Sequence, residues 1–172
     1  MNETHPFGSF VPSDSRYLIL GSFPARTKDN FYKWFYGSNR NQFWQIMENV
    51  YDLKLSDQNT KEDLFTKHKI ALADVIHKTQ RVNNSNLDIN LINRTYNLTG
   101  VSEILKNNKI KKIFFTSRHV ENIFHRHFKS LVQKYPGIAL ITLPSPSPRY
   151  ASLTIGNKIK IYKKHLPKYR SY

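Results

Sequence analysis

The stretch "YLILGSFPARTKDNFYKWFYGSNRNQFW", residues 17–44, places a loop rich in aromatic and basic residues directly after a short apolar run. The run Tyr17–Gly21 is typical of a short buried strand, and the Gly, Pro, Asn and Ser residues after it are typical of turns. Apolar runs of the same kind predict further strands at Ile70–Val75, Lys112–Thr116 and Ile138–Leu143.

Segments with a helical spacing of apolar residues separate these strands. We expect helices over Asn41–Tyr51, Lys61–His68, Thr99–Asn107, Arg118–Val132 and Asn157–His165, the third opening with an approximate capping box. Strands that alternate with helices favour right-handed crossovers and a mostly parallel sheet. We therefore expect an α/β fold, a three-layer α/β/α sandwich with a central, mostly parallel four-stranded sheet, in a single domain of residues 1–172.

The composition limits the chemistry that the chain can perform. The sequence has no cysteine, which excludes disulfides, cysteine-zinc sites, iron–sulfur clusters and thiol nucleophiles. It has no run of about 18 apolar residues, and its first ten residues lack the basic-then-apolar pattern of a signal peptide. We expect a cytoplasmic monomer with no membrane partner.

The charge is strongly positive and unevenly distributed. There are 27 Lys and Arg residues against 12 Asp and Glu, a formal net charge of +15. The last acidic residue is Glu121, and the stretch from Asn122 to Tyr172 carries ten Lys or Arg residues. This pattern favours a nucleic acid as partner over the alternative of a merely solubilising surface. An anionic membrane is disfavoured, because no strongly amphipathic basic helix is evident.

Motifs for cofactors and metals are missing. Neither G-x-G-x-x-G after the first strand nor G-x-x-x-x-G-K-[ST] occurs, so we expect no nucleotide cofactor. His125 and His127 lie near His119, but they are two apart on an expected helix and so point to different faces. Asp63 and Asp74 do not form a paired-carboxylate pattern. We expect no metal site.

Ligands of parallel α/β sheets bind beyond the carboxyl ends of the strands. The loops to inspect are therefore residues 22–40, 77–91, 117–119 and 144–150. The first of them holds "LILGSFPA" followed by "FYGSNRNQFW", and the last holds "LPSPSPRY".

These motifs, together with "IALADVI" and "IKKIFFTSR", resemble the uracil-DNA glycosylase superfamily over nearly the whole chain. Within it, the chain is most similar to the DNA-deoxyinosine (hypoxanthine-DNA) glycosylases and the mismatch-specific uracil and thymine glycosylases. The resemblance implies a DNA glycosylase that flips a deaminated base, uracil or hypoxanthine, out of DNA and hydrolyses its N-glycosidic bond. It implies no cofactor, and DNA as the partner.

The resemblance also assigns candidate base-binding residues. Tyr36 matches the aromatic on which the base stacks, although it could instead belong to the core. Asp74 would accept a hydrogen bond from the ring N–H of uracil or hypoxanthine, and its alternative is a capped turn or an ion pair with Arg81. Gly21 forms the turn, and the backbone amides of Ser22 and Phe23 would donate to the base carbonyl.

The water-positioning residue departs from the common pattern. Many members carry Asp or Asn two residues after the turn glycine, where this chain has Phe23. The deoxyinosine glycosylases share that loss, and the resemblance then places the role on Asn41, before Phe-Trp. An Asn carbonyl orients water but hardly deprotonates it, which suits a dissociative reaction. The alternative is that Asn41 or Asn39 only caps the following helix.

The Pro-Ser loop is the candidate wedge that enters DNA. Its prolines fix the backbone, Arg149 matches an Arg that the thymine-type enzymes insert, and Ser145 would hold a phosphate. Leu143 stands where other members carry His or Asn, and the alternative for the loop is a rigid surface turn. The candidate DNA-binding residues are Pro144, Ser145, Ser147, Arg149, Arg40 and Arg118.

We expect a monofunctional enzyme, because no lysine falls at a motif position where a Schiff base would form. One alternative is a non-catalytic nucleic-acid-binding protein on the same fold, since Phe23 and Leu143 are apolar. Another is a metal-dependent nuclease that uses the histidines.

Overall fold

Four parallel strands form the centre of the computed structural model, which describes residues 2–168. Met1 and residues 169–172, which include Arg170 of the acid-free stretch, lie outside the described residues. The strand order is β3-β2-β6-β7, and each neighbouring pair is parallel. The strands are β2 Tyr17–Gly21, β3 Ile70–Asp74, β6 Lys112–Phe115 and β7 Ala139–Thr142. Each lies within one residue of its predicted bounds.

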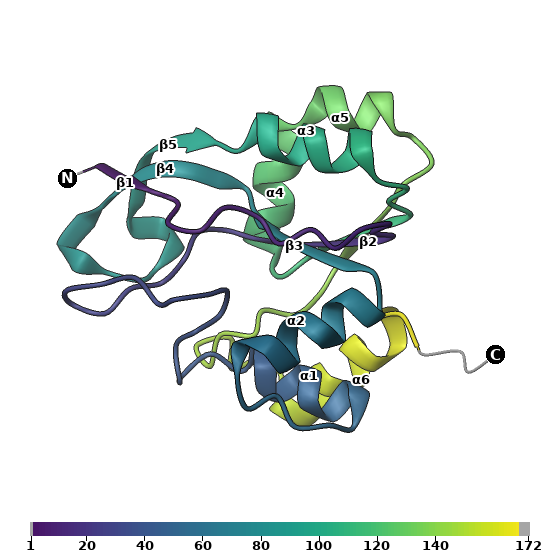
Figure 1. The fold of residues 1–172 in the computed structure, drawn as a ribbon. Coiled ribbons are helices and arrows are strands. Elements are labelled where there is room, and N and C mark those ends of the chain that lie inside the picture. The colour runs from purple at the N-terminus through teal and green to yellow at the C-terminus, as the bar shows by residue number, and fades with distance from the viewer. Residues whose placement is uncertain (1, 169–172) are drawn as a thin grey trace.

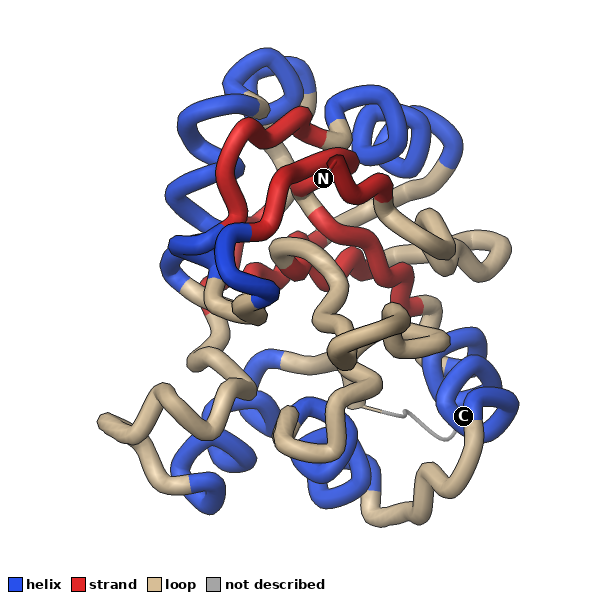
Figure 2. Tube along the Cα trace, turned by 90° about the vertical axis from the view of Figure 1, so that its left-hand side faces the viewer, coloured by secondary structure: helices blue, strands red, loops and turns tan. Residues whose placement is uncertain are grey.

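Helices cover both faces of this sheet (Figures 1 and 2). Along β2, Leu18 and Leu20 pack into the same core cluster as residues of α3 and α4, whereas Ile19 packs into the cluster that contains residues of α1, α2 and α6. This alternation follows from the two-residue period of a strand, and it requires apolar residues at every position of a central strand. The three-layer α/β fold is therefore confirmed. Its helices are α1 Phe43–Tyr51, α2 Gln58–Lys67, α3 Leu98–Asn107, α4 Arg118–His127, α5 Lys129–Lys134 and α6 Ile155–His165.

A second, antiparallel sheet was not predicted. It has the order β1-β4-β5 and consists of Asn2–Thr4, Ile76–Arg81 and Leu91–Tyr96. Residues 77–91 were expected to be a loop, but only the connection between β4 and β5 is one, with 3-10 turns at Val82–Asn84 and Asp88–Asn90. The strand β4 escaped detection because its sequence, "IHKTQR", is mostly polar and half exposed, without the apolar alternation that identifies a strand.

Two helix predictions also need correction. The helix expected over Arg118–Val132 is interrupted at Phe128, whose buried ring packs into the core between α4 and α5. The capping box expected at Thr99 is wrong, because α3 begins at Leu98. The side-chain amide of the preceding residue, Asn97, donates to the backbone oxygen of Asp74 at 3.1 Å. Within residues 2–168, no helix has the length and apolar character needed to cross a bilayer.

Candidate functional site

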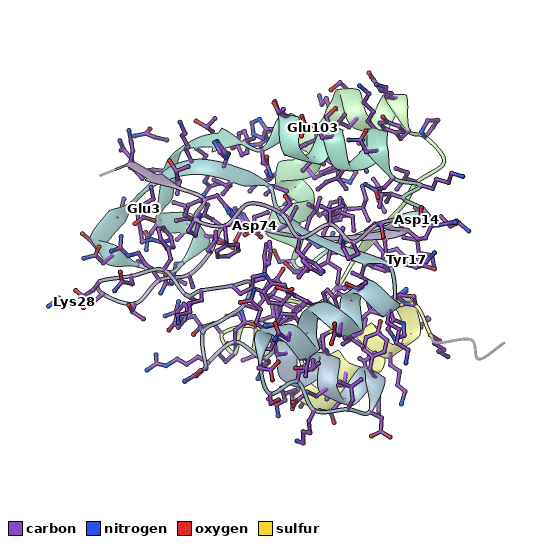
Figure 3. All side chains as sticks on the ribbon, viewed as in Figure 1. Glu3, Asp14, Tyr17, Lys28, Asp74 and Glu103 are labelled. Carbon is purple, nitrogen blue, oxygen red and sulfur yellow. The ribbon has the colours of Figure 1, made fainter. Side chains whose placement is uncertain are left out.

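A cavity of about 520 Å³ opens at the carboxyl edge of the parallel sheet. It is lined by the loops after β2, β6 and β7, by the end of β3 and by the β4–β5 connection. Figure 3 shows Asp74 well inside the molecule, whereas Lys28 lies at the outer end of the loop after β2. The predicted site residues that line the cavity are Ser22, Phe23, Tyr36, Arg40, Asn41, Asp74, Ser145, Ser147 and Arg149. Gly21, Pro144 and Arg118 are not among the lining residues.

Gly21 allows two polar side chains to approach the end of β2. A Cβ atom at this position would collide with Asp74 Oδ1 and would lie 2.8 Å from the Tyr36 hydroxyl oxygen. Any larger residue would therefore push both groups away. The glycine is required because it lets a carboxylate and a hydroxyl converge on one spot at the sheet edge.

His5 fixes the other oxygen of Asp74. Its Nε2 lies 2.9 Å from Asp74 Oδ2, and its Nδ1 accepts a hydrogen bond from the Gly8 amide at 3.1 Å. Because Nδ1 accepts, the proton must be on Nε2, which donates to the carboxylate. The side chains of His5 and Asp74 are only 5% and 6% exposed. The ion pair considered between Asp74 and Arg81 is not formed, since Arg81 pairs with Glu3 at 3.0 Å.

Tyr36 occupies an unusual backbone position. Its φ angle is +52°, in the left-handed region that bulky residues rarely adopt. Its ring stacks on Phe43 with centroids 3.9 Å apart, which holds this conformation in place. Burial, and then the negative charge of Asp74, raise the pKa of the Tyr36 hydroxyl well above its usual value. The hydroxyl is buried, and no hydrogen bond of good geometry to another described residue satisfies it.

The neighbouring aromatics of the same loop are mostly core. Phe35, Phe43 and Trp44 are buried, and the Trp44 indole donates to the Phe35 carbonyl at 2.9 Å. Trp34 stacks on Trp44 with centroids 5.4 Å apart. Of these aromatics only Tyr36 and Phe35 line the cavity, and the Tyr36 ring stacks on the buried Phe43.

Phe23 and Leu143 bring no polar side chain to the cavity. Phe23 packs in the core with its ring 5.8 Å from that of His5, and Leu143 is 1% exposed. The Ser22 hydroxyl donates to Asp88 Oδ1 at 2.7 Å. The backbone amides of Ser22 and Phe23 have no acceptor among the described residues, so they remain available to a ligand in the cavity.

Asn41 lies where the loop enters α1. Its Oδ1 accepts from the Phe43 amide at 2.9 Å, which satisfies one of the open N–H groups of the helix start. Neither Asn41 nor Asn39 is the N-cap residue of α1, which is Gln42, but the Asn41 side chain satisfies an N–H of the first turn from one position earlier. Because Asn41 also lines the cavity, its side-chain amide group faces both the helix and the site.

Two side chains of α6 form hydrogen bonds that hold the Pro-Ser loop, residues 144–150, in place. Lys158 is 1% exposed, and its Nζ donates to Ser147 O and to Gln42 Oε1, each at 2.9 Å. Burial lowers the pKa of this ammonium group. The Tyr162 hydroxyl donates to Pro144 O at 2.9 Å, so Pro144 serves the loop rather than the cavity.

The loop also folds on itself. Ser145 Oγ accepts from the Ser147 amide at 3.2 Å, and Ser147 Oγ accepts from the Arg149 amide at 3.3 Å. The backbone amide of Gln42 donates to Pro146 O at 2.9 Å, which joins this loop to the start of α1. Both serine hydroxyls remain able to donate to a phosphate oxygen.

Exposed arginines surround the mouth of the cavity. Arg40 and Arg149 line it from different loops, and both are exposed. Arg118 begins α4 next to the lining residue Ser117; its side chain is 81% exposed and lies 3.6 Å from Glu121. These cations can contact the phosphates on either side of a nucleotide in the cavity.

The histidines near α4 do not gather. His127 stacks on Tyr96 with centroids 3.8 Å apart, while His125 lies 3.9 Å from Glu121. Within residues 2–168, no three His, Asp or Glu side chains are placed to hold a metal ion.

Sequence reasoning missed His5, Asp88 and Lys158. His5 and Asp74 are 69 residues apart, and no local pattern relates them. Lys158 did carry a signal, because it lies four residues before Tyr162 and therefore on the same face of the expected helix, and the structure buries both.

The fold and the cavity define a class. This is a parallel α/β protein whose ligand site combines an aromatic floor, a buried carboxylate and a basic rim at the carboxyl ends of its strands. The model of the Uracil DNA glycosylase superfamily matches residues 7–166, and the chain belongs to this superfamily. Membership implies a hydrolytic DNA glycosylase that acts on uracil-type bases.

Structural comparison agrees on the fold. The chain is similar to a solution NMR structure from Methanosarcina acetivorans, assigned provisionally as a uracil DNA glycosylase, with a TM-score of 0.63 and 20% sequence identity. The match covers 95% of this chain and 98% of that one. Comparison with curated protein sequences gives no match.

Proposed function

We propose that this protein is a monofunctional glycosylase of the deoxyinosine and mismatch-specific branch, which removes hypoxanthine or uracil from DNA as a flipped base. The observation that carries the proposal is the convergence of Asp74 Oδ1 and the Tyr36 side chain at Gly21, in a cavity that is also lined by Ser22 and Phe23, whose backbone amides are open.

The Asp74 carboxylate and the backbone amides of Ser22 and Phe23 suit the edge of a deaminated base. Uracil and hypoxanthine both present a ring N–H beside a carbonyl. Asp74 Oδ1 accepts from the N–H, while the backbone amides of Ser22 and Phe23 donate to the carbonyl. Cytosine and adenine present a bare ring nitrogen beside an amine, which the carboxylate repels. Selectivity for deaminated bases follows from this arrangement.

Asn41 completes the proposed reaction. The C1′–N bond breaks first, and the base leaves with the electron pair. A water oxygen held by the Asn41 side chain then bonds to C1′, and its proton passes to the departed base or to solvent. The ring of Tyr36, which is backed by the buried Phe43, stacks on the flipped base throughout. The product is an abasic site in an intact strand.

The test is an excision panel. Oligonucleotides carrying uracil, hypoxanthine, xanthine, mismatched thymine or a normal base are incubated with the protein, and alkali-labile sites are scored. We expect alkali-labile sites at uracil or hypoxanthine, and the same result when a metal chelator is present. The strands should break only after alkali treatment. DNA binding without any abasic site would instead establish the non-catalytic alternative, which the apolar Phe23 and Leu143 favour. Loss of activity in chelator would establish metal chemistry.

Asp74→Asn makes the panel specific to the proposed contact. The amide can present a donor or an acceptor, so we expect the hypoxanthine-to-uracil ratio to shift by about ten- to a hundredfold, and exclusion of cytosine to weaken. An equal loss on every base would remove Asp74 from base recognition.

A further inference from the structure

The connection between β4 and β5 carries an exposed apolar tip, residues 82–90. Ile89 is 79% exposed, more than any other large hydrophobic residue in the described part of the chain. Leu87 and Val82 are 39% and 36% exposed on the same tip. Single exposed apolar residues are ordinary, but three within this one segment make it a candidate contact surface. Leu87 also lines the cavity, so this surface adjoins its mouth.

Hydrogen bonds hold the tip in a fixed shape. Nη1 of Arg81 donates to Ser85 O and to Asn86 Oδ1, each at 3.0 Å. Asn86 exchanges hydrogen bonds with the backbone of Arg26, in the loop after β2. Nη2 of Arg94 donates to Asp88 O at 2.7 Å. The exposed side chains therefore stand on a rigid support.

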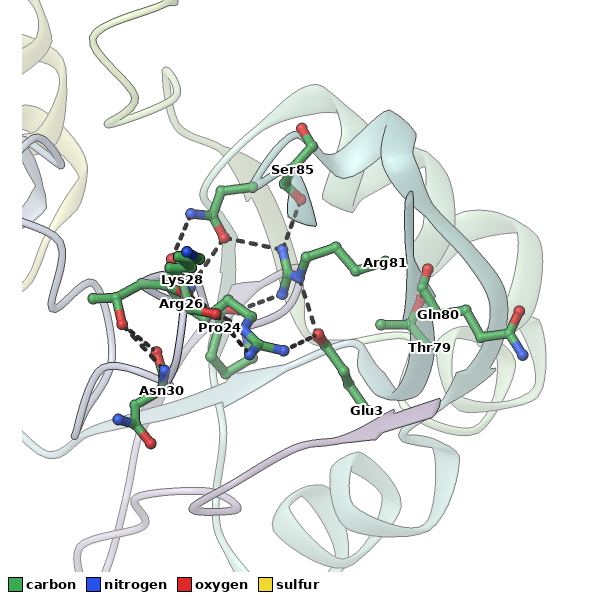
Figure 4. Close-up of polar contacts among 11 residues, drawn as sticks. Glu3, Pro24, Arg26, Lys28, Asn30, Thr79, Gln80, Arg81 and Ser85 are labelled. Carbon is green, nitrogen blue, oxygen red and sulfur yellow. Dashed lines mark hydrogen bonds and ion pairs between the residues drawn. The ribbon is translucent and has the colours of Figure 1, made fainter. Parts of the chain in front are cut away.

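A buried carboxylate anchors this support (Figure 4). Glu3 is 8% exposed and accepts from Arg26 at 2.7 Å and from Arg81 at 3.0 Å. Arg81 also donates to Pro24 O at 3.0 Å. Strand β1, the loop after β2 and the tip are thus joined in one network at the mouth of the cavity.

We propose that this tip is an apolar wedge that enters duplex DNA beside the flipped nucleotide, with Leu87 and Ile89 against the faces of the bases left in the stack. The inference rests on the proposed function and adds a second inserting element to the Pro-Ser loop. Proteins that unstack DNA insert rigid Leu, Ile or Phe side chains between base steps. A preorganised tip loses little conformational freedom on insertion.

DNA is the occupant because of what surrounds the tip. The same cavity mouth carries the exposed Arg40 and Arg149, and the formal net charge is +15. An apolar partner protein would have to cover these cations, whereas DNA contacts both kinds of group at once, phosphates at the rim and base faces in the stack.

The experiment compares Ile89→Ala with Ile92→Ala. Ile92 is 43% exposed on the adjoining β5 and does not line the cavity, so it is a matched isoleucine. Single-turnover excision is measured in duplex and in single-stranded oligonucleotides. We expect Ile89→Ala to lower the duplex-to-single-strand ratio of rates about tenfold, because only a duplex needs unstacking. Ile92→Ala should keep the wild-type ratio.

A second readout does not depend on excision. With 2-aminopurine next to the target base, wild type and Ile92→Ala should raise its fluorescence in the duplex, and Ile89→Ala should not. Equal ratios and equal fluorescence for the two variants would overturn the wedge. Absence of abasic sites with wild type, while the fluorescence still differs between variants, would overturn the proposed function and retain the wedge.

Discussion

Asp74 offers a ligand one oxygen, because His5 occupies the other at 2.9 Å. A carboxylate that is fixed in this way cannot rotate to accept a base in a different register. If Asp74 reads the base as proposed, His5 is a positioning residue that acts through Asp74 rather than on the substrate.

We expect His5→Ala to lower kcat on the preferred base by about ten- to a hundredfold, since a hydrogen bond to a buried charged group contributes about 1.5–3 kcal/mol. His5→Gln should restore most of the activity, because its amide nitrogen can donate in place of Nε2. Steady-state kinetics and thermal melting of both variants are the measurements. A merely structural role would lower the melting temperature in both variants without rescue of kcat by glutamine.

Asn41 has two functions that mutation can separate. Asn41→Ala removes the hydrogen bond to the Phe43 amide, which should cost about 1 kcal/mol of unfolding free energy. If Asn41 also orients water, turnover should fall roughly 10²-fold or more. Asn39→Ala, at an exposed neighbour outside the cavity lining, is the control. Wild-type turnover with reduced stability would show that the cap is its whole role.

At the scale of elements, the strands of the parallel sheet were predictable and those of the small sheet were not. Every residue of β3 is buried, so its sequence is a continuous apolar run between polar segments. Strands β1 and β4 pair at the edge of the molecule with mostly polar sequences, and their pairing spans residues 2–80. No local pattern encodes such a contact, so neither the pairing of β1 nor the place of His5 could be predicted; β4 and β5 pair locally but carry too little apolar alternation to be recognised.

The candidate functional site was likewise predictable only in part. The residues of the loops that follow parallel strands could be placed at one sheet edge, and those that line the cavity do lie there. Which aromatics reach the cavity could not be read from the loop sequence, because the core residues Phe43 and Trp44 and the cavity residue Tyr36 lie close together in it, and the backbone turn at Tyr36 decides where its ring lies. The left-handed φ of Tyr36 has no signature in a residue of this type.

Helix α6 supports the Pro-Ser loop through Lys158. We expect Lys158→Met to leave Ser147 O and Gln42 Oε1 unpaired, at a cost of about 1–3 kcal/mol, and to lower the melting temperature by several degrees. Affinity for duplex DNA should fall as the loop loosens. Lys160→Met removes an exposed lysine of the same helix and is the control for charge. Equal effects of the two variants would mean that Lys158 acts by charge alone.

At the scale of the whole molecule, the formal net charge of +15 predicts a strong dependence of binding on salt. If about 4–6 phosphates are contacted, log affinity for duplex DNA should fall against log salt with a slope of roughly −3 to −6. Fluorescence anisotropy over a range of salt concentrations measures this slope. Arg149→Gln should make it shallower by about one. A slope near zero would remove the electrostatic basis of DNA binding.

The contacts of β1 and His5 bear on the order in which the molecule folds. Glu3 meets Arg81 across 78 residues, and His5 meets Asp74 across 69. Loop length alone does not rank these contacts, because β2 pairs with β6 across a longer stretch, Tyr17 with Lys112. Strand β1 differs in being three residues long and polar, so its pairing buries little apolar surface, whereas β2, β3 and β6 are buried in the core. In a refolding experiment followed by hydrogen exchange, the amides of the parallel sheet should become protected first. The binding cavity would then be assembled last, by a segment that contributes little to the core but completes the site.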